Sequence, residues 1–255
     1  MYKRVIIKLS GEALGGLDGQ ILDRSKAESI ASQLVELSAS VDVSAVVGGG
    51  NMWRGRSSDS KMSRVKADQM GMLATVMNAI YMADVVRSLG GKSVVMTPFE
   101  VGNMSLPYSI ELANDYFSKG FVVFFAGGLG HPYFSTDTIP VLRACELGAD
   151  AILFAKNIDG VYDDNPKTNP AAKRLNRTTY DYIIENRLEA LDLEAMVMCA
   201  KNDKLSLVFA LEHPDCLKIA VTDYDSFKSI GTLITKEYSE LSLKQPNQAS
   251  SIGTD

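Results

Sequence analysis

Short apolar segments of strand length alternate with segments of helical periodicity along most of this chain. The segments predicted as strands are 3–10, 43–47, 93–96, the run beginning at 121, 151–154, 205–209, 218–221 and 232–234. The segments predicted as helices are 24–38, 65–89, 106–118, one that begins near 138, 179–187 and 193–201. Strands that alternate with helices favour a mainly parallel sheet covered on both faces, so the sequence predicts an α/β fold.

The stretch from 121 to 150 shows this pattern most clearly. An apolar run typical of a buried parallel strand is followed by Gly127, Gly128 and Gly130. Candidate helix caps come next, at Ser135, Thr136 and Asp137, with Pro140 in the first turn and Gly148 as the C-cap. A strand, a glycine loop and a helix start together form a place where backbone N–H groups hold an anion. An ordinary turn that binds nothing is the alternative.

The long helix predicted over 65–89 is rich in methionine. Its large apolar positions are Met70, Leu73, Met77, Ile80 and Tyr81. Other methionines lie off this stripe, so more than one face of the helix is expected to be buried. Because methionine-rich faces are adaptable packing surfaces, we predict a subunit interface here.

The chain shows no internal repeat and no linker. We therefore expect a single domain over residues 1–236. From residue 237 on, Ser, Gln, Asn and Lys dominate, so residues 237–255 are predicted to be a flexible polar tail.

Composition narrows the class of protein. The chain has 255 residues, 46% of them hydrophobic and 22% charged, which is typical of a globular protein with a sizeable core. A net charge of -5 argues against nucleic acid as a partner. Three scattered cysteines indicate reduced core thiols, and no apolar run approaches the length of a membrane span. We expect a cytoplasmic protein without membrane contact.

Glycine-rich loops follow three predicted strands, at 11–16, 48–50 and 127–130. In an open α/β sheet such loops gather at the carboxyl edge, where ligands bind. Neither common nucleotide motif fits them. A Walker A loop ending at Gly91 would need glycine at Val86, and a dinucleotide fingerprint starting at Gly48 would need glycine at Trp53. Several phosphate-capable loops without either motif suggest a kinase fold of another kind.

Six segments resemble the signature segments of the bacterial UMP kinases, a branch of the amino acid kinase family. They are residues 8–12, 48–55, 68–75, 132–137, 159–162 and 231–234. The similarity extends from about residue 2 to residue 234. The resemblance implies an αβα sandwich around a twisted, mainly parallel sheet, and a homohexamer. It also implies the reaction ATP + UMP giving ADP + UDP, with Mg²⁺ carried by ATP and no metal site of the protein's own.

On the ATP side, the resemblance implies contacts by Lys8, Leu9, Ser10, Gly11, Gly50, Arg54, Asn157, Tyr162 and Asn165. Phosphoryl transfer needs positioning and charge neutralisation more than covalent chemistry. Lys8 supplies a point charge between the phosphates, Arg54 a bidentate fork, and the backbone N–H groups of Ser10 and Gly11 suit the ATP phosphates. A strand-end lysine without a ligand, a solvated arginine and a core Tyr162 remain the alternatives.

On the acceptor side, the resemblance implies that UMP is bound by Gly49, Asp68, Leu129, Gly130, His131, Pro132, Tyr133, Phe134, Ser135 and Thr136. Asp68 would accept hydrogen bonds from the ribose, and Thr136 would contact the phosphate. The alternative for Asp68 is an acid in a first helical turn, stabilised by the macrodipole. Asp137 completes the predicted catalytic set with Lys8 and Arg54, by orienting Lys8 or the magnesium. Simple helix capping is the alternative for Asp137.

Three positions depart from the family pattern. Leu129 and His131 stand where the family has a threonine and an asparagine that read the uracil edge. Leucine has no side-chain hydrogen bond, so base reading there falls to its backbone, whereas histidine can donate or accept. Asn165 replaces an aspartate on the ATP side, removing a charge and keeping an acceptor.

Three other functions stay open at this point. One is another enzyme of the family that phosphorylates a carboxylate or carbamate. A second is a non-catalytic nucleotide-binding protein, against which the joint presence of Lys8, Arg54 and Asp137 speaks. The third is an oxidoreductase, which the missing third glycine disfavours.

Overall fold

The computed structural model describes residues 2–16, 19–53, 61–189 and 191–237. Its strands are β1 (Arg4–Leu9), β2 (Asp42–Val47), β3 (Lys92–Thr97), β4 (Leu106–Pro107), β5 (Phe121–Phe125), β6 (Ala151–Lys156), β7 (Val161–Tyr162), β8 (Arg174–Leu175), β9 (Arg177–Thr179), β10 (Leu205–Ala210) and β11 (Gly231–Thr235). Among the described residues, nine of these strands form one sheet, in the order β4-β3-β5-β2-β1-β6-β10-β11-β9. Only the pair β10–β11 in that sheet is antiparallel. The strands β7 and β8 form a separate hairpin.

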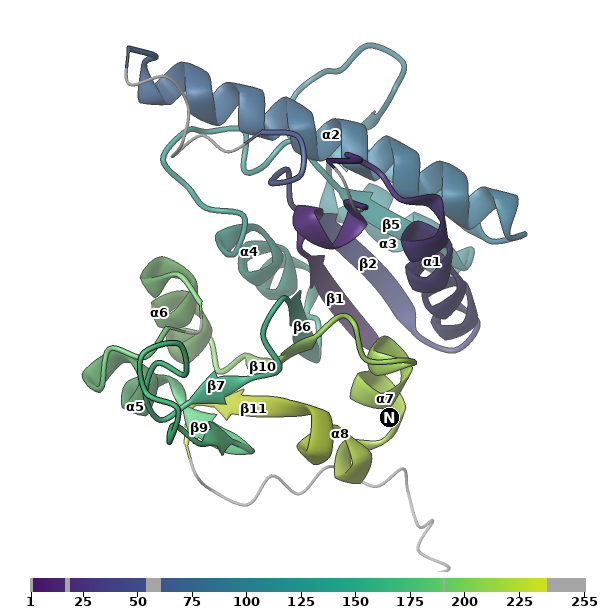
Figure 1. The fold of residues 1–255 in the computed structure, drawn as a ribbon. Helices are drawn as coiled ribbons and strands as arrows, with labels where there is room; N and C mark the ends of the chain where they lie inside the picture. Colours follow the sequence, from purple (N-terminus) through teal and green to yellow (C-terminus); the bar gives the residue numbers. More distant parts are fainter. Residues whose placement is uncertain (1, 17–18, 54–60, 190, 238–255) are drawn as a thin grey trace, which may run out of the picture.

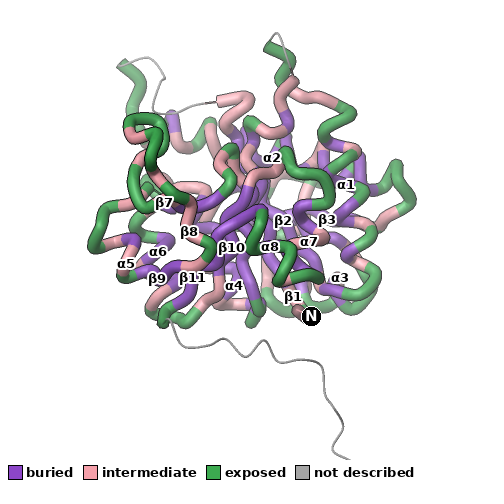
Figure 2. Tube along the Cα trace, turned by 60° about the horizontal axis from the view of Figure 1, so that its bottom comes forward, coloured by how far each residue is buried: buried purple, intermediate pink, exposed green. Residues whose placement is uncertain are grey.

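Helices cover both faces of the sheet (Figure 1). They are α1 (Arg24–Ser38), α2 (Arg64–Ser88), α3 (Ile110–Ser118), α4 (Thr138–Leu147), α5 (Tyr180–Glu185), α6 (Leu193–Lys201), α7 (Cys216–Thr222) and α8 (Tyr224–Ile230). Helices α1, α2, α7 and α8 pack into one apolar core, and α3, α4, α5 and α6 into another on the opposite face. Buried segments run through the middle of the molecule and exposed segments lie around its edge (Figure 2). The predicted αβα sandwich around a mainly parallel sheet is confirmed.

The alternation of side chains assigns each strand residue to one face. On β1, Val5, Ile7 and Leu9 point into the core of α1 and α2, whereas Ile6 points into the core of α4. Lys8 therefore lies on the α4 face, because residues two apart on a strand share a face. On β6, Ile152 and Phe154 also point into the α4 core.

The predicted meeting of the glycine loops is also confirmed. Strands β5, β2 and β1 are direct neighbours in the sheet. The loops that leave them line a common pocket. A short 3₁₀ helix, η1 (Gly11–Leu14), forms the first of these loops.

One predicted element is wrong, and the start of another is misplaced. Residues 218–221 lie within α7 rather than in a strand. In this helix Leu217, Ala220 and Val221 are buried at helical spacing, a pattern that so short a segment does not distinguish from a strand. The predicted helix over 106–118 begins only at Ile110, where the Ser109 side chain caps it by accepting from Leu112 N. Pro107 before it lies in the edge strand β4, a position that tolerates proline.

Helix α2 buries a different face from the one that its large side chains suggest. Met70, Leu73 and Met77 are 40%, 52% and 58% exposed. The buried face consists mostly of alanines and valines, among them Ala74 and Ala79. Small side chains let this helix approach the sheet closely, so Met70, Leu73 and Met77 are left on the outside, whereas Met82 is buried and Ile80 and Tyr81 pack against the core. Whether a second subunit covers them stays a prediction.

The tail predicted over 237–255 lies almost wholly outside the described residues. The assignment of 1–236 to a single domain likewise stays a prediction.

A buried threonine gives a test of the packing between β9 and β11. Thr178 is fully buried and its hydroxyl has no hydrogen-bond partner among the described residues. A buried unsatisfied hydroxyl costs free energy, so Thr178→Val should leave the free energy of unfolding unchanged or raise it by about 1 kcal/mol. Urea denaturation measures this difference.

Thr232 on β11 is the matched control. It is equally buried, but its hydroxyl accepts from Val161 N at 2.9 Å and donates to Leu175 O. Thr232→Val should therefore lower the free energy of unfolding by about 1–3 kcal/mol. Equal losses in both variants would mean that Thr178 has a partner after all.

Candidate active site

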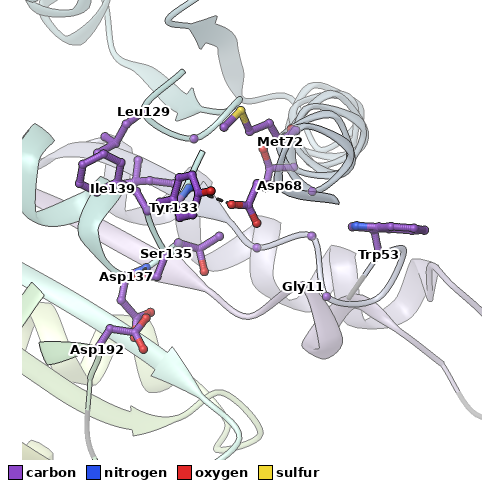
Figure 3. A pocket seen from close by; sticks show the side chains of 18 of the residues that line it. Gly11, Trp53, Asp68, Met72, Leu129, Tyr133, Ser135, Asp137, Ile139 and Asp192 are labelled. Carbon is purple, nitrogen blue, oxygen red and sulfur yellow. Dashed lines mark hydrogen bonds between the residues drawn. The ribbon is translucent and has the colours of Figure 1, made fainter. Parts of the chain in front are cut away.

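A pocket of about 840 Å³ opens at the carboxyl edge of β1, β2 and β5 (Figure 3). Its walls come from the three glycine loops, the first turns of α2 and the segment from 128 to 139. Thirteen of the predicted site residues line it: Lys8, Ser10, Gly11, Gly49, Gly50, Asp68, Leu129, His131, Tyr133, Phe134, Ser135, Thr136 and Asp137. Four of the residues predicted for the donor and most of those predicted for the acceptor thus line one cavity.

The other predicted residues lie elsewhere. Leu9, Gly130 and Pro132 are neighbours of lining residues but are not part of the wall, and Leu9 is wholly buried in the core. Asn157, Tyr162 and Asn165 follow β6, away from the described wall, although Asn157 donates to Glu12 Oε2 at 3.0 Å and Glu12 lines the pocket. Arg54 lies outside the described residues.

Close backbone packing explains two of the glycines. A Cβ on Gly11 would lie 2.2 Å from Gly48 O, so the first two loops touch through their backbones. A Cβ on Gly49 would lie 2.9 Å from the Cβ of Ala74 on α2. The loops therefore reach this position only without side chains.

Two polar residues of α2 fasten the loops, and sequence reasoning missed both. Asn78 is fully buried and donates to Gly48 O at 2.6 Å and to Asn51 Oδ1 at 2.7 Å. Thr75 Oγ1 accepts from Gly127 N at 2.9 Å. The signal in the sequence was the presence of these two polar residues among the alanines and valines that α2 buries. Buried polar groups are nearly always paired, so each predicted a hydrogen-bond partner.

The centre of the site is an ion cluster of Lys8, Asp137 and Lys156. Lys8 Nζ lies 3.1 Å from Asp137 Oδ1, and Lys156 Nζ lies 2.9 Å from Asp137 Oδ2. The Asp137 side chain is 7% exposed. Burial by itself raises the pKa of its carboxyl, but the two ammonium groups outweigh this effect and hold the pKa below its usual value. Asp137 is therefore an anion shared between two cations.

This geometry corrects the capping alternative for Asp137. Its side chain makes no capping hydrogen bond to α4. Ser135 instead holds the turn before α4, because its hydroxyl accepts from Asp137 N at 3.2 Å and its carbonyl accepts from Thr138 Oγ1 at 2.7 Å. The orientation of Lys8 by Asp137 agrees with the prediction, although a role in transfer stays a proposal.

The expectation for Ser10 also needs adjustment. Its backbone N–H donates to Ala155 O at 3.3 Å and so ties the first loop to the end of β6. A phosphate contact by that N–H would have to share this bond.

At the other end of the pocket, Asp68 holds the segment that was predicted to face the base. Its Oδ2 accepts from Tyr133 N at 2.8 Å, the dashed contact in Figure 3. Tyr133 has a φ of 74°, which is strained for a residue other than glycine. Arg64 Nε lies 3.6 Å from the same Asp68 oxygen, and the Arg64 guanidinium lies 4.7 Å from the centre of the Tyr133 ring. Asp68 is the fifth residue of α2 and no acid lies in the first turn of that helix, so the alternative of an acid in a first helical turn is wrong.

The three departures from the family pattern lie in different surroundings. Leu129 packs against the α4 core, whereas His131 is exposed at the pocket. Asn165 Oδ1 accepts a hydrogen bond from Lys167 N at 3.0 Å. The acceptor that this residue retains is therefore used within its own turn.

Several lining residues were not predicted. They include Glu12, Trp53, Met62, Arg64, Met72, Asp192 and Glu194. Trp53 Nε1 donates to Ala67 O at 2.8 Å and so anchors the second loop to α2. Asp192 and Glu194 come from the start of α6, far along the chain, and no local pattern links them to the loops.

The described part of the chain contains no cluster of three or more side chains suited to hold a metal ion. Likewise, none of its described helices has the length and apolarity needed to span a membrane.

The chain is similar in sequence to kinases of one family. The model of the amino acid kinase family matches residues 3–209. A uridylate kinase of Streptococcus thermophilus is 41% identical over 239 residues, which cover 92% of this chain and 96% of that protein.

The chain is also similar in fold to solved structures of kinases. The UMP kinase of Bacillus anthracis superposes with a TM-score of 0.86 at 32% identity, covering 92% of this chain and 97% of that chain. The UMP kinase of Ureaplasma parvum gives the same TM-score and identity, covering 92% of this chain and 100% of that chain. By sequence and by fold, this chain belongs to the amino acid kinase family.

Proposed function

We propose that this chain is a UMP kinase, which transfers the terminal phosphoryl group of ATP to UMP and so serves pyrimidine nucleotide biosynthesis. The uridylate kinases and UMP kinases to which it is similar support this function. The observation that carries it is the position of Lys8. Its ammonium group is held by Asp137 in a pocket that the predicted donor and acceptor residues share.

The proposed chemistry is electrostatic. Transfer between two phosphate groups concentrates negative charge, and a preorganised cation in a sheltered site stabilises it. Lys8 is 8% exposed, so its charge is little screened by water. Gly11 and Gly50 bring backbone close to the ATP phosphates, and Arg54 adds a bidentate contact. Mg²⁺ enters as part of the MgATP substrate, since Asp137 already uses both oxygens on lysines.

On the acceptor side, we assign Asp68 Oδ1 to the ribose, because Oδ2 accepts from Tyr133 N. Thr136 at the helix start takes the UMP phosphate. Base reading falls to the backbone of the 129–132 segment and to the exposed His131, since Leu129 has no polar side-chain atom.

We further propose a cytoplasmic homo-oligomer, a hexamer by resemblance, in which a second copy covers the exposed stripe of Met70, Leu73 and Met77 on α2. These three side chains lie at positions i, i+3 and i+7 and so form a continuous apolar strip. Such strips on otherwise polar surfaces mark interfaces.

The function is tested by measuring ADP release with UMP, CMP, dUMP, aspartate and acetylglutamate as acceptors. UMP should be the preferred acceptor. Lys8→Ala should lower kcat by at least about a hundredfold, since a lost transition-state contact costs about 3 kcal/mol or more. Its circular dichroism should match that of the wild type. Preference for aspartate or acetylglutamate would move the protein to another activity of the family, and turnover near the wild-type value would remove Lys8 from the chemistry.

Asp68→Asn separates ribose binding from loop support. The amide oxygen can still accept from Tyr133 N, but the charge-assisted bonds to the ribose are lost. The variant should raise KM for UMP by about tenfold and leave KM for ATP within about twofold. The ratio of kcat/KM for UMP to kcat/KM for dUMP should also fall.

Glu111→Gln, in the first turn of α3, is a control for the loss of a helix acid that does not line the pocket. It should change neither KM. If Asp68→Asn melts earlier but keeps its KM for UMP, the carboxylate serves the fold alone and the acceptor site is misplaced.

The oligomer is tested by light scattering, which should give a mass several times 27.7 kDa. Leu73→Glu should lower that mass, because a charge in a dry apolar contact is costly to bury. Gln69→Glu, also exposed on α2, should leave it unchanged. A monomeric wild type at micromolar concentration would be incompatible with this interface.

A further inference from the structure

Lys156 is the one member of the central ion cluster that neither the sequence pattern nor the resemblance indicated. It ends β6, the direct neighbour of β1, and Phe154 two residues earlier pairs with Lys8. Because residues two apart on a strand share a face, Lys8 and Lys156 project from the same face of the sheet. The start of α4 lies over that face and places Asp137 between them.

The backbone around Lys156 is fixed on both sides. Its carbonyl accepts from Leu211 N at 3.1 Å, and the preceding carbonyl, of Ala155, accepts from Ser10 N. The second of these bonds ties the end of β6 to the loop that follows Lys8. Lys156 is therefore part of the same rigid edge as the predicted phosphate loop.

The charges in this cluster do not cancel. One carboxylate faces two ammonium groups, all with side chains 20% exposed or less. A pair of Lys8 and Asp137 alone would be neutral, and its attraction for phosphate would be weak. With Lys156 present, the cluster carries one net positive charge beside the pocket that Lys8 lines.

We propose that Lys156 is a positioning residue for phosphoryl transfer, which takes up one oxygen of Asp137 and so keeps the charge of Lys8 effective toward the phosphates. This inference rests on the proposed function. Lys156 does not line the pocket, so it acts through Asp137 and not by touching the substrate. Asp137 in turn fixes the direction of the Lys8 ammonium group.

Lys156→Met removes the charge and keeps an unbranched side chain. It should lower kcat by ten- to a hundredfold while KM for UMP changes less than threefold. Lys156→Arg, which retains the charge, should stay within about fivefold of the wild type. Lys92→Met removes a lysine at the amino end of β3, on the far edge of the sheet, and should leave kcat unchanged.

The double variant Lys156→Met with Asp137→Asn decides between charge and packing. It removes one positive and one negative charge, so the cluster again carries one net positive charge on Lys8. It should be at least fivefold faster than Lys156→Met alone. Restored activity supports the proposal, because a loss of packing cannot be repaired by a second deletion.

Binding of inorganic pyrophosphate, measured by calorimetry, tests the same electrostatics without any acceptor. The affinity for pyrophosphate should fall about tenfold in Lys156→Met and recover in the double variant. Unchanged affinity together with wild-type kcat in Lys156→Met overturns the proposal, as does a folded double variant that is no better than the single one in both measurements. Because this readout does not depend on UMP, a wild type that fails to phosphorylate UMP refutes the proposed function and leaves the role of Lys156 to be decided by pyrophosphate binding.

Discussion

The pocket depends on a carboxylate that is buried between two lysines. Removing an ion from water is costly, and a buried charge is tolerated only when it is paired and hydrogen-bonded. Asp137 meets this condition through Lys8 and Lys156, which lie on neighbouring strands. The parallel register of β1 and β6 therefore determines the electrostatics of the site. A shift of β6 by one residue would turn the Lys156 side chain to the opposite face of the sheet.

The glycine loops depend in the same way on helix α2. Its alanines let it lie close to the sheet, and at that distance Asn78 and Thr75 reach the backbones of Gly48 and Gly127. Larger residues on that face would separate the helix from the loops. The small side chains toward the sheet and the exposure of Met70, Leu73 and Met77 on the opposite side thus have a common cause.

How much the sequence predicts depends on how local each feature is. Helix α1 is predicted with its bounds, because its periodicity lies within adjacent residues and its cap, Asp23, directly precedes it. The placement of the glycine loops follows from strand alternation and the rule for parallel sheets. Helix α7 is mistaken for a strand because the short segment 218–221, with only three apolar residues, fits either a strand or a helix. Asp192 and Lys156 are missed for another reason: each joins the site through an element far along the chain, and their side chains carry no local signature.

The acceptor end shows how one residue can serve both structure and recognition. Tyr133 holds a strained backbone conformation, and such strain persists only where surrounding contacts enforce it. Asp68 supplies one such contact through Tyr133 N, and Arg64 supplies another by packing on the ring. The segment that would read the base is thereby tied to the carboxylate that would hold the sugar. In this chain the base-reading segment has Leu129 packed into the α4 core in place of a polar side chain. If this segment reads the base as proposed, selection of the base depends on backbone groups whose positions Asp68 helps to fix, and a change at Asp68 would then affect base and sugar together.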